Sequence, residues 1–305
     1  MAVHNIFNMA GPPRSVPLSV RLRVLFGGAF NQAGWFVLGF GMAFVWAFTL
    51  NADLTGWYLF RGRLDTAEGK AIDCKKTSFS EGGSKHSKGT PVYAIHYAFT
   101  AADGTEYKGL SYITGKQFKQ GQKVTIEYPQ GRPQTSRIKG MRRKPVGLFG
   151  LIPVIFPLIG LLFITGGIRK GLKANRLLAL GEQTKGRLKS KERTNTQVNK
   201  KPVYKLTFEF NTSEGMTYEA VAKTHETGKL EDQTEEPLLY DPVRPSYAVM
   251  LDDLPGNPRI NDTGNIKAGS ASGTIMLLII PLVTIIGHGI YIYLKFLSKK
   301  FFQES

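Results

Sequence analysis

Residues 146–168, VGLFGLIPVIFPLIGLLFITGGI, contain no charged side chain and are long enough as a helix to cross a bilayer core of about 30 Å. This stretch predicts a membrane-spanning helix. Two further apolar segments, residues 33–50 and 273–294, stand at a distance on either side of it. Between the apolar segments lie two polar ones, residues 55–141 and 180–262, which we call module 1 and module 2. The predicted order along the chain is therefore helix, module, helix, module, helix.

Both modules show the alternation of large and small or polar side chains that is typical of half-buried β-strands. The clearest case is PVYAIHYAFT at residues 91–100, which places four large apolar side chains on one face. About five short strands are expected in each module, and such sets form small barrels or curled sheets. The predicted fold class is three transmembrane helices alternating with two small antiparallel modules, each barrel-like or a curled sheet. Residues 1–32 and 295–305 are expected to be an N-terminal tail, loosely held, and a C-terminal tail.

The two modules also resemble one another in sequence. PVYKLTFEFNTSEGMTYEA at residues 202–220 aligns without a gap on PVYAIHYAFTAADGTEYKG at residues 91–109. Further along, YPQGRP at residues 128–133 is matched by YDPVRP at residues 240–245. A turn that closes the sheet explains this second match better than a binding motif does. The pattern predicts an internal repeat of one β module.

A known family shares these features. The alternating strand, the Asp-Gly turn, the tyrosine after the turn and a last strand ending in Tyr-x-Pro-x-x-Pro together resemble domain of unknown function 3592 (DUF3592) of bacterial membrane proteins. The resemblance covers roughly Gly69–Ile138 and, more weakly, Gly186–Met250. It departs from the usual pattern in module 1, where no residue separates Tyr128 from Pro129. The resemblance implies a membrane location and a β-rich module, and it brings no activity and no catalytic residues. The expected location is the bacterial inner membrane, with several spans.

The search for catalytic or metal-binding patterns is negative. Cys74 is the only cysteine, and the five histidines are scattered without any metal-ligand spacing. Phosphate-binding loops and nucleophile motifs are not found either. The acidic run at residues 226–236 lacks the ligand spacing of a calcium loop and indicates a solvated loop. We therefore expect no catalytic residue, metal or cofactor.

The chain is strongly basic, with a formal net charge of +17. Such a charge favours polyanionic partners. Because the aromatic residues alternate into the predicted cores, they are not expected to stack on bases, and no nucleic acid is expected as a partner. The lipid bilayer with anionic lipids is the expected partner. The candidate lipid contacts are the basic residues on both sides of the central segment: Lys139, Arg142, Arg143, Lys144, Arg169, Lys170, Lys173 and Arg176.

Three functions fit these features. The favoured one is a non-catalytic integral inner-membrane protein whose duplicated β modules bind a partner protein, an envelope component or anionic lipid, in an accessory, sensor or immunity role. An alternative is a subunit of a membrane transport or secretion assembly, for which polar residues within the spans are expected. Only His288, Thr284 and Thr165 qualify, and His288 is better interpreted as an interfacial histidine near the end of its span. A membrane enzyme acting on lipid or peptidoglycan is the third and weakest fit.

Membrane orientation depends on the first span, because lysines and arginines near the span ends are almost equally divided between the two sides. The N-terminal tail carries Arg14, Arg21 and Arg23 and no acidic residue, which favours a cytoplasmic N-terminus. Module 1 is then outside and module 2 in the cytoplasm. An alternative keeps both modules on one side, with Pro153 and Pro157 folding the central stretch into a re-entrant hairpin.

This orientation predicts the outcome of cysteine labelling. A membrane-impermeant maleimide should reach Cys74 from outside when module 1 is loosened by a mild denaturant. A cysteine introduced by Asn195→Cys should react only after the membrane is broken. Equal labelling of both cysteines from one side contradicts this orientation and favours the hairpin, and labelling of residue 195 alone from outside inverts the orientation.

Overall fold

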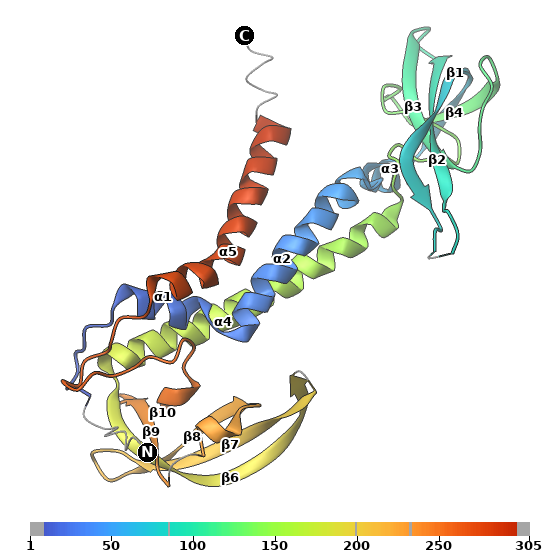
Figure 1. Ribbon diagram of the computed structural model, residues 1–305. Helices are drawn as coiled ribbons and strands as arrows, with labels where there is room; N and C mark the ends of the chain where they lie inside the picture. Colours follow the sequence, from blue (N-terminus) through green and yellow to red (C-terminus); the bar gives the residue numbers. More distant parts are fainter. Residues whose placement is uncertain (1–8, 85, 199, 232–233, 298–305) are drawn as a thin grey trace. The chain divides into compact units, whose positions relative to one another are not determined.

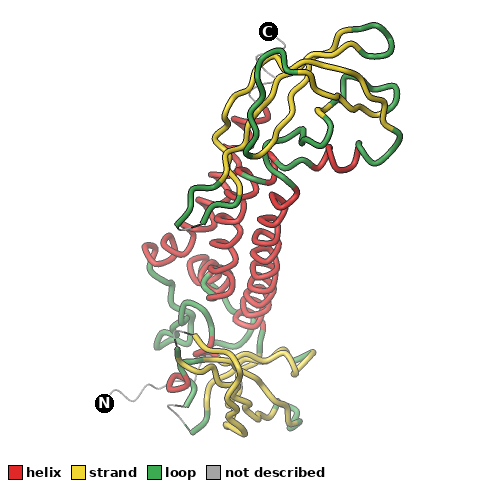
Figure 2. The backbone as a smooth tube through the Cα atoms, turned by 90° about the vertical axis from the view of Figure 1, so that its right-hand side faces the viewer, coloured by secondary structure: helices red, strands yellow, loops and turns green. Residues whose placement is uncertain are grey.

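The computed structural model describes residues 9–84, 86–198, 200–231 and 234–297. The chain forms two compact units, one made of residues 1–39 and 158–305 and the other of residues 40–157. The first unit contains module 2, and the second contains module 1 (Figures 1 and 2). Most of the predicted C-terminal tail, residues 298–305, lies outside the described residues.

Three helices are long and apolar enough to cross a membrane, as expected. Helix α2 (Ala29–Ala47) continues through a short 3-10 turn to Asn51. Helix α4 (Ile155–Leu180) follows a 3-10 segment that starts at Leu148, and α5 (Ala271–Ile292) ends in a wider turn that reaches Leu297. Their apolar side chains are largely exposed, with only 11% to 22% of each most apolar window buried. The length and composition of the helices fit membrane spans.

The central helix differs from its prediction in length. Residues 148–180 form one continuous helical segment, so Pro153 and Pro157 do not fold it back into a hairpin. Pro157 lies in the first turn of α4, where its missing N–H leaves no hydrogen bond unmade. The helix also extends beyond the predicted end at Ile168, because Leu177 and Leu178 are buried in an apolar cluster beside module 2.

Among the described residues, from residue 9 on, the N-terminal segment is not a loose tail. Residues 18–26 form helix α1 (Leu18–Phe26), and the side chains of Val16, Val20 and Val24 are buried in the same cluster as Leu177. The Arg14 side chain is buried too, and its guanidinium donates hydrogen bonds to the carbonyls of Leu178, at 3.4 Å, and Gly181, at 2.8 Å. Arg14 thereby pairs carbonyls at the C-terminus of α4 that the helix leaves unsatisfied. The sequence signal missed here is the spacing of the three valines.

Module 1 is a five-stranded antiparallel sheet with the order β3-β2-β1-β4-β5. It follows a short helix, α3 (Leu54–Leu59). The strands are β1 (Leu64–Glu81), β2 (Thr90–Thr100), β3 (Glu106–Thr114), β4 (Lys123–Pro129) and β5 (Arg137–Ile138). The alternating aromatic side chains fill its core, where Tyr97 and Phe99 are at most 3% exposed.

Module 2 repeats this architecture with the order β10-β9-β6-β7-β8. Its strands are β6 (Glu182–Val198), β7 (Lys201–Asn211), β8 (Thr217–Thr224), β9 (Glu236–Asp241) and β10 (Arg244–Met250). Both sheets curl but stay open, so the barrel-like alternative is wrong and the curled sheet is right (Figure 2). The terminal strand β5 of module 1 has only two residues, which is too short to pair along β3.

The two sheets share their register in detail. Gly69 of β1 faces Phe99 in module 1, and Gly186 of β6 faces Phe210 in module 2. The long first strand shifts register twice in each module, after Ala71 and Lys76 in β1 and at the corresponding places in β6. This agreement extends the similarity well beyond the hairpin that aligned in sequence.

Glycines bring the apolar helices into close contact. A Cβ atom built on Gly160 of α4 would lie 2.8 Å from the carbonyl oxygen of Gly34 in α2, which no real side chain tolerates. A Cβ atom on Gly39 of α2 would lie 2.7 Å from the hydroxyl of Thr284 in α5. These glycines therefore contact neighbouring helices, although they do not form a GxxxG pattern.

Gly109 of β3 gives a test of the packing in module 1. A side chain at this position would overlap the ring of Tyr97, whose hydroxyl donates to Ser136 Oγ at 3.0 Å. We expect Gly109→Ala to destabilise module 1 by about 1–3 kcal/mol through overpacking. The measurement is the urea dependence of labelling at Cys74, a half-buried residue beside the same core. Lys108 is the exposed neighbour of Gly109, and Lys108→Ala provides the control, which should leave the urea dependence of Cys74 labelling unchanged. The overlap would be contradicted if Gly109→Ala also left this urea dependence unchanged.

Candidate ligand-binding cavity

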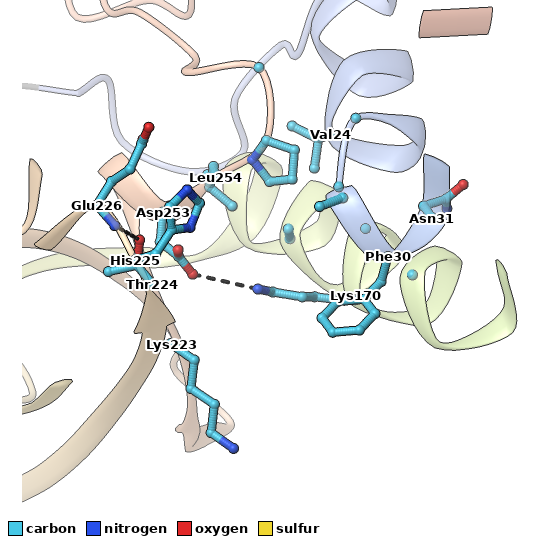
Figure 3. Close-up of a pocket in the computed structure, with 18 of the residues that line it drawn as sticks. Val24, Phe30, Asn31, Lys170, Lys223, Thr224, His225, Glu226, Asp253 and Leu254 are labelled. Carbon is cyan, nitrogen blue, oxygen red and sulfur yellow. Dashed lines mark hydrogen bonds and ion pairs between the residues drawn. The ribbon is translucent and has the colours of Figure 1, made fainter. Parts of the chain in front are cut away.

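A cavity of about 650 Å³ lies within the unit that contains module 2. One wall is formed by the α1–α2 junction and α4, the opposite wall by the ends of β6, β7 and β8, and the third side by the loop after β10 (Figure 3). The volume suits a small ligand or a few residues of a peptide. The described part of the chain thus has a concave site that no sequence motif indicated.

The helical wall is lined by small residues. Gly167 and Gly171 of α4 lie one turn apart in the cavity wall, and Gly27 and Gly28 line it from the α1–α2 junction. Gly171 is needed for packing, because a Cβ atom there would lie 2.9 Å from the carbonyl oxygen of Val24. The same absence of side chains leaves room in the cavity. Phe30, at the start of α2, is exposed at its edge.

The wall formed by module 2 is lined by alternating polar and apolar residues. Val198 and Val203 contribute apolar surface, and Thr194 and Thr224 contribute hydroxyls. The Thr194 hydroxyl donates to the Val203 carbonyl at 2.8 Å and accepts from the Thr196 N–H at 3.3 Å. The Thr224 hydroxyl accepts from the Glu226 N–H at 3.0 Å. Both hydroxyls therefore hold the ends of the strands in place.

Charged groups gather at one side of the cavity. The Lys170 ammonium reaches Asp253 at 3.5 Å, and His225 and Glu226 follow the end of β8, whose Lys223 side chain points away from this pair (Figure 3). Burial raises the pKa of Asp253 above its ordinary value, and the neighbouring Lys170 only partly opposes this effect. The site therefore combines an apolar interior with both signs of charge at its margin.

The predicted lipid contacts before the central helix divide into two pairs. Lys139 and Lys144 are exposed, as a lipid contact requires. Arg142 instead turns toward module 1, where its guanidinium forms an ion pair with Glu81 and donates to the Thr114 hydroxyl at 3.0 Å. The Arg143 N–H donates to Asp53 Oδ2 at 2.8 Å. This segment is thus attached to the module.

The Arg142 contacts change the ionisation of Glu81. Burial alone would raise the pKa of this carboxyl, but hydrogen bonds from Thr114 and Arg142 outweigh burial and hold the pKa below its ordinary value. The attachment contributes stability above the ordinary pKa of a glutamate, and this contribution is lost as the pH falls through the lowered pKa.

The basic residues after the central span lie on the continuing helix α4. Lys170 lines the cavity, the Lys173 ammonium lies 4.1 Å from the centre of the Tyr247 ring, and Arg176 pairs with Asp241 at 3.3 Å. Arg169 is exposed, with no ion pair among the described residues. Three of the four therefore contact module 2 residues, because α4 does not end at the predicted boundary.

The polar residues of the apolar helices join α2 to α5. His288 Nε2 lies 3.1 Å from the Gly39 carbonyl, and the Thr284 hydroxyl donates to the Trp35 carbonyl at 3.4 Å. The Gln32 amide donates to the Leu277 carbonyl at 2.9 Å. His288 is half-buried in this contact rather than free at an interface. Thr165 bonds to the Leu161 carbonyl of its own helix.

The comparisons with known proteins give no relatives: no family model, no curated protein and no solved structure matches this chain. The resemblance to DUF3592 therefore stays a prediction. Among the described residues, no group of three or more histidine, cysteine, aspartate or glutamate side chains could hold a metal ion.

Sequence reasoning found parts of this cavity without recognising it. From sequence, Lys170 is a candidate lipid contact, and Glu226 belongs to an acidic run that indicates a solvated loop. Val198, Lys223 and His225 gave no signal, because the walls come from segments far apart in the sequence.

The charge of Asp253 predicts a pH dependence. The folded protein holds this proton at a pH where the unfolded chain, with its ordinary pKa of 3.8, has lost it. Stability should therefore fall as the pH rises from that value through the raised pKa. Asp253→Asn should be more stable than wild type at pH 7 and equal to it below about pH 3.5, as measured by thermal unfolding. Asp262→Asn, at an exposed site, is the control. A less stable Asp253→Asn at pH 7 would show that the Lys170 pair outweighs burial.

Proposed function

We propose that this chain is a non-enzymatic, multi-pass protein of the bacterial inner membrane whose two β modules are copies of one binding unit, with module 2 holding the open site. The observation that carries this proposal is the cavity of about 650 Å³ between the end of module 2 and the helices α1, α2 and α4. A partner protein is the occupant that this geometry favours.

The duplication is supported by agreement at several levels. The strand orders match, the registers match, and both first strands shift register at corresponding places. A side-chain contact also recurs: the Thr77 hydroxyl donates to the Val92 carbonyl at 2.8 Å, as Thr194 does to Val203. Two modules that differ in their surroundings but keep such contacts are explained most simply by one ancestral unit.

Binding fits the cavity better than catalysis. An enzyme needs a nucleophile or an acid–base pair held within reach of the substrate. Of the three threonines that line the cavity, Thr194 and Thr224 engage backbone groups through their hydroxyls, and Asp253 is paired with Lys170. The polar residues of the helices give little support to a transport role. Gln32, Thr284 and His288 contact backbone carbonyls of neighbouring helices.

The proposal also includes anionic lipids, which belong to the bilayer around the helices. The exposed Lys139, Lys144 and Arg169 are the candidate contacts that remain free to meet phosphates. Each such residue near an anionic leaflet contributes about 1 kcal/mol to membrane attraction.

A photoreactive residue in the cavity tests the proposed function. A benzophenone side chain introduced at Val198 should give one defined protein adduct upon illumination of intact membranes. Val221, exposed on β8 and not part of the cavity lining, provides the matched control and should give little of this adduct. The proposal fails if both positions give the same adducts, or if the Val198 position gives none while the control reacts.

A further inference from the structure

The edge strands β3 and β8 occupy the same place in the two sheets. In module 1 Tyr112 faces Ala94 on the neighbouring strand, and in module 2 Lys223 faces Lys205 at the corresponding place. Each hairpin begins with a backbone bond at its turn, from Ala101 to Thr105 and from Thr212 to Met216. Hydrogen-bonded and non-hydrogen-bonded residue pairs alternate along an antiparallel hairpin. Counted from these bonds at the turns, Tyr112 and Lys223 stand in non-hydrogen-bonded pairs, so their backbone N–H and C=O groups point away from the neighbouring strand.

Module 1 occupies this edge with its own chain. The Tyr112 N–H donates to the Arg142 carbonyl at 2.7 Å, and the Arg142 N–H donates back to the Tyr112 carbonyl at 3.0 Å. The Arg142 side chain then reaches Glu81 at the end of β1 and Thr114 at the end of β3. Arg142 thus bridges to the edge strand through its backbone and places its side chain against the ends of two strands.

Module 2 gives the Lys223 backbone no hydrogen-bond partner among the described residues, although β10 packs beside β8. The last strands correspond, because Ile138 pairs with Ile126 in module 1 as Met250 pairs with Leu238 in module 2. Arg142 lies four residues after Ile138, and the residue four positions after Met250 is Leu254. Leu254 is therefore the counterpart of Arg142. Leu254 is 2% exposed in the apolar cluster that includes Val24. Among the described residues, no backbone hydrogen bond joins Leu254 to Lys223. The cavity is the space beside β8 that this turn of the chain leaves unfilled.

The residues around the open edge define the side chain that fits it. Val198 takes the place of Glu81, and His225 takes the place of Thr114, by the shared register. At this position, the carboxylate that holds the arginine in module 1 is therefore replaced by an apolar side chain in module 2. Val203, Leu230 and Leu254 line the cavity beside Val198, so burial of a large apolar side chain is favoured there.

We propose that the free edge of β8 at Lys223 binds an extended segment of a partner protein by strand addition, with a large apolar side chain of that segment in the cavity. This inference rests on the proposed binding function and adds the mode and the chemistry of recognition. Main-chain bonds to Lys223 supply affinity, and the apolar interior supplies the choice of side chain. The charges of Lys170 and Asp253 at the margin meet polar residues on either side of the apolar one.

The test uses the full-length protein in lipid nanodiscs and a displayed library of random heptapeptides. Selected peptides should share a large apolar residue at their centre. Lys223→Pro removes the N–H donor at a position where an edge strand accepts proline, and it should weaken binding of these peptides about tenfold or more. Lys223→Ala removes the side chain but keeps the N–H donor, so it should weaken binding of these peptides much less than Lys223→Pro does.

A second variant tests the specificity. Val198→Glu restores the carboxylate of module 1, and selection against it should return peptides with a central arginine. Val198→Glu leaves β8 unchanged, so its result does not depend on whether β8 folds with a proline at position 223.

The outcomes separate this inference from the proposed function. Peptides that bind with equal affinity to wild type and Lys223→Pro, with Val198→Glu leaving the preference unchanged, overturn strand addition but leave a binding module elsewhere. A site that selects no peptide, and that loses a bound phospholipid in native mass spectrometry upon Lys223→Ala, overturns the peptide ligand in favour of lipid phosphate. Failure of the photoreactive probe at Val198 to give a defined protein adduct counts against the function itself.

Discussion

The backbone groups along the edge of an open sheet need partners, and this requirement connects the main features of the structure. A sheet of five strands that does not close leaves N–H and C=O groups facing outward on its edge strands, here β3 and β8. Module 1 satisfies those of Tyr112 within its own chain through Arg142. Module 2 has the same sheet, yet the corresponding segment turns into the apolar cluster through Leu254. One architecture thus gives a closed edge and an open one.

The helices explain why the two segments behave differently. In the unit containing module 2, α4 continues past its most apolar part, and Leu177 and Leu178 form one cluster with α1 and with the loop after β10. Burying Leu254 there gains apolar contact that a charged residue could not gain. The segment of module 1 instead carries Arg142, whose charge is satisfied by Glu81 at the strand ends. The two placements thus go with a leucine in one module and an arginine in the other at corresponding positions.

The sequence was sufficient for the elements whose signal is local. The three apolar runs and the alternating strand at residues 91–100 identify helices and sheets from period and length alone. The end of α4, the α1 helix and the openness of the sheets depended on tertiary contacts, since Leu177, Val20 and Val24 are stabilised by packing against distant segments. The cavity was beyond prediction for the same reason: its walls come from α1, α2, α4 and three strands. Only Lys170 and Glu226 carried a sequence signal, and each was assigned to solvent or lipid.

Hydrogen exchange at two corresponding amides tests the central claim most directly. The Tyr112 and Lys223 N–H groups occupy corresponding positions in the two sheets, and among the described residues only the Tyr112 N–H has a backbone partner outside its hairpin. In the purified protein without added ligand, the Tyr112 amide should exchange slowly and the Lys223 amide rapidly, although their neighbours in β3 and β8 are equally protected. Equal protection of the two amides would contradict an open edge in module 2.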